Sequence, residues 1–518
     1  MPPDGGRVNH PQSTPITQHL SMLPSEIWLE IFNRLPLESI PSIFMTNRTF
    51  SVLARPLRFS HFNFMPFTSS LLEYHIPTPA EPERLEFWCS ERIAPLVRSC
   101  PIRPWLPFPM RLNNATEDNS NAAFGLLTTF LSKIEWFERL ESLELVDAPL
   151  TDPEFRKIFY CLPSLRTLQI EHISGPLPSE AAVSQALPLA QLRNFSLTSD
   201  YSYPNGGDDL APYLPLLNPS TLRRLTLCCT LPAGDTTLDS IATFPQITHL
   251  SIAAKNDTCF SALLRKCSNI QELHVIGDVD AAQAADVVNG FGATLACVKK
   301  LSTVSRQLME AFIRRATQLR ILLCNYSYSW RTEREPFFSF ILSHRLQSAS
   351  LSLLDVHVGL VRPDGFQLLM NSFPALKHLA LRAMPHMDET TPDGHSVAVV
   401  YLEELASIPA TLTPTLQTLF LTWPSSRRGH LQVPGLTVEN LRATLQSITQ
   451  RYPTLNALGV DAGSFVFRWE RNQIWGLQEE YGIDQDDGEL PRKLHIRDRL
   501  NNMWEDIEAE ELKSEEST

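Results

Sequence analysis

The sequence predicts an α/β protein in which a small three-helix domain is followed by a curved solenoid with a parallel sheet. Two observations predict this fold. Twelve copies of the pattern L-x-x-L-x-L, with other apolar residues in some leucine positions, follow one another from Leu140 to the copy at Leu455. Before them, Ile27, Ile31 and Leu35 recur every four residues, which is the spacing of one face of a helix.

The first helices are predicted in residues 21–62, after a leader of residues 1–20 that we expect to be disordered. Three short apolar runs, at 24–35, 37–45 and 48–54, indicate three helices. A unit of this size buries little apolar area and is marginally stable without a partner or a neighbouring domain. Apolar side chains that it leaves exposed would form a binding surface.

The helices carry their own start and stop signals. Pro24 suits a first helical turn, where its missing N–H costs nothing, and Pro36 is expected to end the first helix. Thr46-Asn47 is expected to cap the third helix and Pro56 to end it.

Several residues of this segment match one known motif: Leu23-Pro24, Glu26, Ile27, Ile31-Phe32, Leu35, Ile40, Asn47-Arg48, Phe50 and Leu53. They cover about 40 of the 518 residues. On these residues the segment resembles the F-box, and especially its fungal versions, although Phe50 stands where many members of the family carry tryptophan.

The resemblance implies docking onto the Skp1 adaptor of a cullin-RING ubiquitin ligase. The residues that it implies for Skp1 docking are Leu23, Pro24, Ile27, Ile31, Phe32, Leu35, Ile40 and Leu53. The alternative is an ordinary three-helix cap of the solenoid, in which these side chains pack inward.

The repeats are predicted to form a leucine-rich-repeat solenoid over residues 126–462. Most copies lie 21 to 30 residues apart, close to the period of leucine-rich repeats, and the last two spacings are 40 and 39 residues. Each L-x-L predicts a short strand with alternate residues buried, and a helical pattern precedes many of the strands. Weak copies start at Val298 and Leu346. Unrelated leucine-rich strands in another α/β domain are the alternative.

The flanking segments fit neither pattern. Residues 63–125 are rich in proline and aromatic residues, and we expect an irregular linker that packs on the first repeats. Residues 463–493 are expected to cap the last repeat. Residues 494–518 are expected to form an acidic helix and a disordered tail, and the stripe of that helix either packs back or binds a partner: Leu500, Met503, Trp504 and Ile507.

Charge and composition exclude several classes of function. The net charge is −13, and residues 461–518 alone carry 16 acidic against 7 basic residues, so no clustered basic footprint for nucleic acid is present. The nine cysteines include no Cys-x-x-Cys pair and favour reduced thiols in an intracellular protein. No signal-peptide pattern and no run of 18 apolar residues occurs, so we expect the cytoplasm, the nucleus or both.

No motif for catalysis, metal or cofactor binding is found. His-Glu-x-x-His and the phosphate-binding G-x-x-x-x-G-K are both missing, and Gly290-Phe291-Gly292 lacks the third glycine of a dinucleotide fingerprint. We therefore expect no catalytic residue, no metal site and no cofactor. An enzyme whose site is assembled on the rim of the solenoid is the less favoured alternative.

The remaining candidate is a surface for a protein partner. Residues between the buried leucines of each strand are expected to face outward on the concave side, among them Glu144, Gln169, Ser196, Thr226, Ser251 and Ser350. The candidate target-binding residues are Ile321, Leu323, Phe420 and His274. The alternative is that loops or the C-terminal segment cover the three apolar ones.

The sequence thus predicts a substrate-recognition adaptor of a Skp1–cullin–F-box ubiquitin ligase. The expected partners are a Skp1-like adaptor, through it a cullin, and an unknown target protein, with no nucleic acid and no membrane. A leucine-rich-repeat scaffold that acts without a ligase is the second hypothesis.

Overall fold

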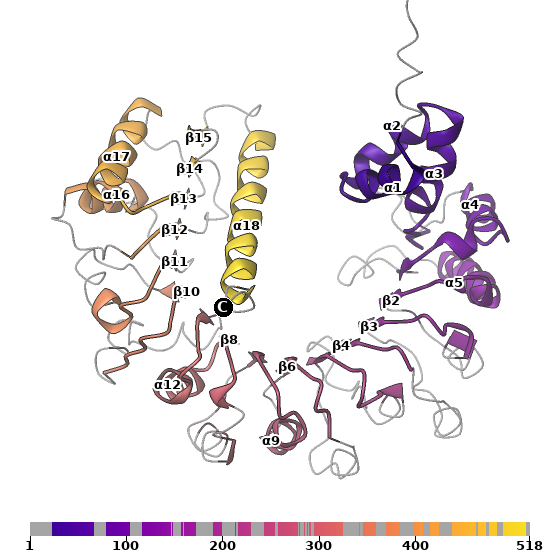
Figure 1. Ribbon diagram of the computed structural model, residues 1–518, viewed down its shortest axis with the longest axis horizontal. Coiled ribbons are helices and arrows are strands. Elements are labelled where there is room, and N and C mark those ends of the chain that lie inside the picture. Colours follow the sequence, from indigo (N-terminus) through magenta and orange to yellow (C-terminus); the bar gives the residue numbers. More distant parts are fainter. Residues whose placement is uncertain are drawn as a thin grey trace, which may run out of the picture. The chain divides into compact units, whose positions relative to one another are not determined.

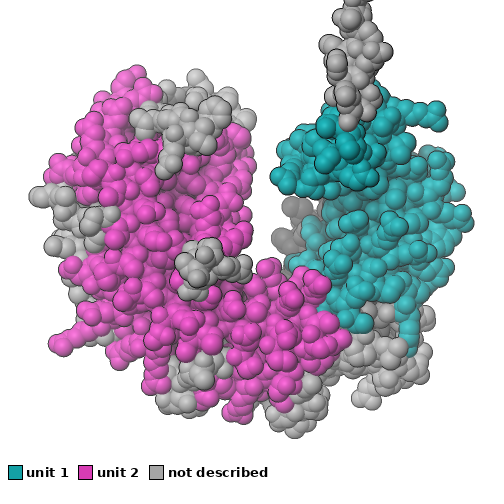
Figure 2. All heavy atoms as spheres, viewed as in Figure 1, with its two compact units in different colours: residues 1–192 teal, residues 193–518 magenta. Residues whose placement is uncertain are grey.

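The computed structural model folds into two compact units, residues 1–192 and 193–518 (Figure 2). The structure describes residues 23–66, 79–103, 117–146, 148, 157–158, 160–171, 190–198, 213, 216–228, 243–253, 257–277, 279, 284, 287, 290–291, 295–324, 341, 345–358, 369–383, 397–407, 415–423, 438–462, 465–472, 476–483 and 490–513. The predicted leader and the end of the predicted tail, 514–518, lie outside the described residues.

The three predicted N-terminal helices are confirmed. They are α1 (Ser25–Asn33), α2 (Ile40–Phe44), which a 3₁₀ turn at Leu37–Ser39 precedes, and α3 (Arg48–Arg58). Asn47 caps α3 as predicted, because its side-chain oxygen accepts a hydrogen bond from the Phe50 N–H at 2.8 Å. The prediction that Pro56 ends α3 is wrong: the helix continues to Arg58, and the Phe59 N–H still donates to the Arg55 carbonyl.

An apolar cluster holds these helices together. Phe32, Ile40 and Ala54 are buried in it, one from each helix. Trp28 and Phe50 complete the aromatic packing, with ring centroids 4.8 Å apart, and Phe50 meets Phe32 edge to face at 5.3 Å. One face of α1 is therefore used for this core.

Residues 63–125 are more regular than the predicted linker. They contain α4 (Glu81–Trp88), a 3₁₀ turn (Ala94–Leu96), strand β1 (Ser99–Ile102) and the start of α5 (Glu117–Ser132). Strand β1 pairs in parallel with β2 (Ser142–Val146), which pairs in parallel with β3 (Thr167–Glu171). The repeat pattern thus begins upstream of Leu140.

The early repeats were missed because residues other than leucine occupy the buried positions. Val97, Cys100 and Ile102 have the spacing of L-x-x-L-x-L, and all three are buried. Phe62 and Phe64 are also buried. Their segment lies beside β1, because single parallel bridges join His61 to Ser99 and Phe64 to Ile102 at the two ends of that strand. Sequence reasoning that searched for leucine could not find them.

The second unit carries a continuous run of strands, β4 to β15. Strands β4 to β13 pair in parallel with their neighbours in chain order. Their bounds are β4 (Asn194–Thr198), β5 (Arg224–Cys228), β6 (His249–Ala253), β7 (Glu272–Ile276), β8 (Lys300–Thr303), β9 (Ile321–Cys324), β10 (Leu353–Val358), β11 (His378–Ala383), β12 (Thr418–Thr422) and β13 (Ala457–Asp461).

The predicted strand of the copy at Leu346 is wrong. The strand lies at β10, five residues further on than predicted, so its repeat is Leu351, Leu354 and Val356. The register of β10 against β9 and β11 fixes this placement. Both readings fit the local leucines, and only pairing with the neighbouring strands separates them.

The end of the sheet is closed by an antiparallel pair, β14 (Phe465–Asn472) and β15 (Gly476–Ile483). This pair lies within residues 463–493, the segment that we expected to cap the last repeat. It covers the edge of β13, which would otherwise expose unpaired backbone groups.

Helices lie on both faces of the second unit's sheet (Figure 1). On one face are α9 (Asp257–Lys266), α12 (Arg306–Arg315), α16 (Val397–Ser407) and α17 (Val438–Arg451). The long helix α18 (Leu490–Lys513) lies on the opposite face, which we call the inner face. The chain is an α/β leucine-rich-repeat solenoid with an N-terminal helical region.

Candidate protein-binding surfaces

The first candidate surface is an apolar stripe along α1. Leu23, Ile27, Ile31 and Leu35 are 45%, 47%, 38% and 36% exposed, although all four are large aliphatic residues. Ile27 and Ile31 are one turn apart and share one side of α1, with Leu23 just before the helix and Leu35 just after it, while Phe32 is buried. Pro24 is exposed at the start of the stripe. Exposed aliphatic side chains grouped on a small unit make this surface a candidate protein interface.

Three residues expected in the docking set are placed differently. Phe32 and Ile40 are 3% and 2% exposed inside the three-helix cluster, and Leu53 packs against the same cluster. The prediction that Phe32 and Ile40 offer contact surface is therefore corrected: they hold the helices together. Helical spacing alone could not separate the two sides of α1, because Trp28 and Phe32 make both sides apolar.

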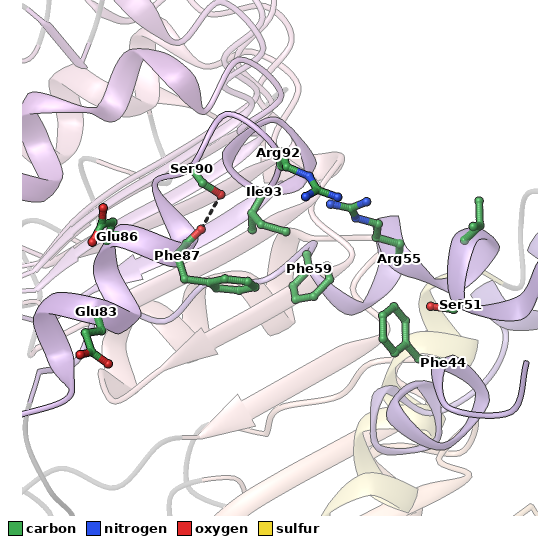
Figure 3. A pocket seen from close by; sticks show the side chains of 11 residues that line it. Phe44, Ser51, Arg55, Phe59, Glu83, Glu86, Phe87, Ser90, Arg92 and Ile93 are labelled. Atoms are coloured by element: carbon green, nitrogen blue, oxygen red, sulfur yellow. Dashed lines mark hydrogen bonds between the residues drawn. The ribbon is translucent and has the colours of Figure 1, made fainter. Parts of the chain in front are cut away.

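The sequence also missed exposed apolar residues on the same three helices. Met45 and Val52 are 79% and 65% exposed. Val52 lines an open pocket of about 650 Å³ between α3 and α4, whose aromatic side chains are Phe44, Phe59 and Phe87. Figure 3 shows the charged side chains of this pocket in two places, Arg55 with Arg92 and Glu83 with Glu86.

The second candidate surface is the inner face of the second unit. The structure buries Ile321 completely and leaves Phe420 only 9% exposed, because α18 covers them. Leu323 is half-buried against the same apolar cluster. These residues lie on the expected face, but α18 occupies it, which is the arrangement given above as the alternative.

Helix α18 contributes its own apolar stripe to this cluster. Ile496, Leu500 and Trp504 are buried, and Met503 and Ile507 pack at the margin. The predicted C-terminal helix is thus present and begins four residues earlier than expected. Ring centroids of Trp504 and Phe420 lie 5.4 Å apart.

Ion pairs fix α18 at both ends. Near its start, Arg497 is hydrogen-bonded to Asp461 of β13. Near its end, Glu508 pairs with Lys300, and the Glu511 carboxylate accepts hydrogen bonds from Lys377 Nζ at 2.9 Å and Ser352 Oγ at 2.7 Å.

His274, the last of the four predicted target-binding residues, lies on the inner face beside these ion pairs. Its Nδ1 is 3.2 Å from Ser251 Oγ, and the side chain is half-buried. Burial, together with the nearby positive charge of Lys300, lowers the pKa of His274. A neutral imidazole at neutral pH can offer one donor and one acceptor to a partner.

Sequence reasoning missed the polar residues that receive α18. Lys300, Lys377 and Ser352 occur on strands or beside them with no motif of their own. Gly459 is a further indication in the sequence. It lies at an inner-face position of β13, aligned with Phe420 of β12, and a glycine inside a strand often marks the close approach of another segment.

Within the described residues, no group of histidine, cysteine and carboxylate side chains could hold a metal ion. The seven described cysteines are all free thiols. Burial raises the pKa of Cys89 to about 11 and that of Cys267 to about 12, so both are poor nucleophiles at neutral pH. No described helix is long and apolar enough to cross a membrane.

Comparisons with known proteins give similarity to solved structures alone. No protein-family model matches the sequence, and no curated protein is similar to it. The chain is similar to TLR13 in the crystal structure of the TLR13–ssRNA13 complex, with 15% identity and a TM-score of 0.30 over 72% of this chain and 52% of that one. It is also similar to the leucine-rich repeat-containing protein LegL7 from Legionella pneumophila, with 12% identity and a TM-score of 0.31 over 76% of this chain and all of that one.

Proposed function

We propose that this protein is the substrate-recognition adaptor of a Skp1–cullin–F-box ubiquitin ligase. The exposed stripe of Leu23, Ile27, Ile31 and Leu35 carries the proposal. It presents aliphatic side chains outward, whereas an ordinary cap of the solenoid would pack them inward. Burial of the part of each side chain that is still exposed would contribute about 0.5–1.5 kcal/mol.

In this proposal the solenoid holds a target protein and the helices α1 to α3 hold the ligase. The chain itself would perform no chemistry, because the transfer of ubiquitin belongs to other subunits. Its contribution would be the effective concentration and orientation of a target lysine.

Co-expression with Skp1 tests the proposal. Ile27→Asp combined with Ile31→Asp places two charges on the stripe without disturbing the buried side of α1, and we expect at least about a 100-fold loss of Skp1 affinity. Replacement of both Leu23 and Pro24 by Ala should also prevent co-purification. Tyr160→Asp is the matched control, since Tyr160 is 53% exposed in the same unit outside the three helices.

Two outcomes would count against the proposal in different ways. Wild-type affinity in the folded double variant would exclude the stripe as the Skp1 contact. Skp1 binding without recruitment of a cullin would instead favour a leucine-rich-repeat scaffold that acts outside a ligase.

A further inference from the structure

The inner face of the second unit has an apolar centre against which the apolar side of a helix packs. Rows of aligned residues run across strands β8 to β13, and the row that contains Lys300, Ile321, Leu353 and His378 is apolar in its middle. Val466 of β14 extends the apolar area. Three residues of α18 at i, i+4 and i+8 fill this area: Ile496, Leu500 and Trp504.

Small residues make room for these side chains. Ala380 and Gly459 flank Phe420 in the neighbouring aligned row. A Cβ atom at Gly459 would lie 2.8 Å from the Phe420 ring and 2.9 Å from the Leu500 methyl Cδ2. The face is therefore hollowed where a large apolar side chain of a helix enters.

Charges at the two ends of this hollow fix the direction of a bound helix. Asp461 lies at one end and receives Arg497. Lys300 and Lys377 lie toward the other end and receive Glu508 and Glu511. A helix seated here needs a basic residue near its start and carboxylates near its end.

That charge order opposes the dipole of the helix itself. The first turn of α18 contains no acidic residue, while Glu510 and Glu511 stand in the last turn, followed by the favourable Lys513. Cations at the start and anions at the end of a helix are unfavourable in isolation. The carboxylates near the end of α18 are instead matched by Lys300 and Lys377 of the sheet.

The sheet does not depend on α18 in the same way. Strands β14 and β15 already close its edge, and α18 adds no strand. Among the described residues, no backbone hydrogen bond joins α18 to the sheet. Release of α18 would leave the strand pairing intact and expose the hollow.

We propose that the inner face of strands β8 to β14 is a receptor for an acidic amphipathic helix of a partner protein, and that α18 occupies it as an intramolecular competitor. The partner helix would carry a basic residue near its start, three apolar residues at i, i+4 and i+8, and carboxylates about one turn beyond them, as α18 does. This inference deepens the target-binding half of the proposed function and rests on it.

A labelled synthetic peptide with the sequence of residues 490–513 is the probe, added to the full-length chain without Skp1. The double variant Glu508→Lys, Glu511→Lys removes the charge pairs that hold α18 and leaves the hollow unchanged. We expect faster amide hydrogen exchange in 490–513 and peptide binding about tenfold tighter than in the wild type. Asp498→Lys with Glu505→Lys is the control, because both residues are on the exposed side of α18 and the charge change is equal.

A second pair of reagents tests the receptor itself. Lys300→Glu with Lys377→Glu should bind the native peptide poorly and bind a peptide with the two glutamates changed to lysine. The proposal would be overturned if amide hydrogen exchange in α18 were unchanged in the Glu508→Lys, Glu511→Lys variant. It would also be overturned if α18 exchanged faster in that variant but the chain still did not bind the peptide. Neither result depends on Skp1, so each is distinguishable from failure of the α1 docking surface.

Discussion

Arg497 and Asp461 form a two-pronged ion pair between α18 and strand β13. Arg497 Nε donates to Asp461 Oδ2 at 2.7 Å, and the terminal nitrogen Nη2 donates to Oδ1 at 2.8 Å. Both side chains are partly exposed, at 28% and 22%. The fork geometry makes this contact directional, which a single point charge cannot reproduce.

Arg497→Lys keeps the charge and removes the fork. We expect it to weaken the docking of α18 by about 1 kcal/mol, measured as faster amide hydrogen exchange in residues 490–513. Arg314→Lys is the control, since Arg314 pairs with Glu310 one helical turn away in α12 at 2.8 Å. Equal protection of α18 in both variants would show that the fork adds nothing to the charge.

Gly459→Ala is expected to destabilise the second unit. The added Cβ would meet Phe420 and Leu500 at distances below 3.0 Å, and insertion of a methyl group into such packing costs about 1–3 kcal/mol. Thermal unfolding of the full chain measures the effect. Gly290→Ala is the matched control, because nothing lies within 4 Å of its added Cβ. The prediction fails if the two variants unfold at the same temperature.

The repeated strands could be predicted from the sequence because buried leucines recur with a fixed spacing. Eleven of the twelve predicted copies start two residues before an observed strand, from Leu140 with β2 to Leu455 with β13. The copy at Leu346 failed because the leucines around it permit two registers, and register is decided by neighbouring strands.

The surfaces were less predictable for a physical reason. The spacing of Ile27, Ile31 and Leu35 predicted a helix face, but which face is buried depends on Ile40 and Ala54 of the other helices. Likewise, the stripe of α18 was visible in the sequence, whereas its position over the inner face depends on pairs distant in sequence, such as Lys300 with Glu508. Local periodicity carries no information on such partners.

Glu511 predicts an acid-sensitive contribution to stability. Hydrogen bonds from His378, and from Lys377 and Ser352, outweigh burial and hold the pKa of the Glu511 carboxyl well below its ordinary value of 4.5. Because the pKa is lower in the folded state, the carboxylate stabilises the fold fully above about pH 4.5 and progressively less as the pH falls below it.

Glu511→Gln tests this dependence. The difference in unfolding free energy between wild type and variant should shrink as the pH falls below about 4.5. Denaturant unfolding at a series of pH values provides the measurement. A difference that stays constant down to pH 3 would contradict the assignment of the shift to Glu511.

Phe32 and Ile31 are neighbours on α1 with opposite environments, so they separate the packing role of α1 from its docking role. Phe32→Ala removes a buried ring and should cost about 3–5 kcal/mol, enough to unfold a three-helix unit of this size. Ile31→Ala removes a side chain that is 38% exposed and should change the stability by less than about 1 kcal/mol. Hydrogen exchange over residues 25–58 distinguishes the two. If Ile31→Ala instead unfolds the helices, the stripe is a packing surface of the fold, and Skp1 docking through α1 loses its structural basis.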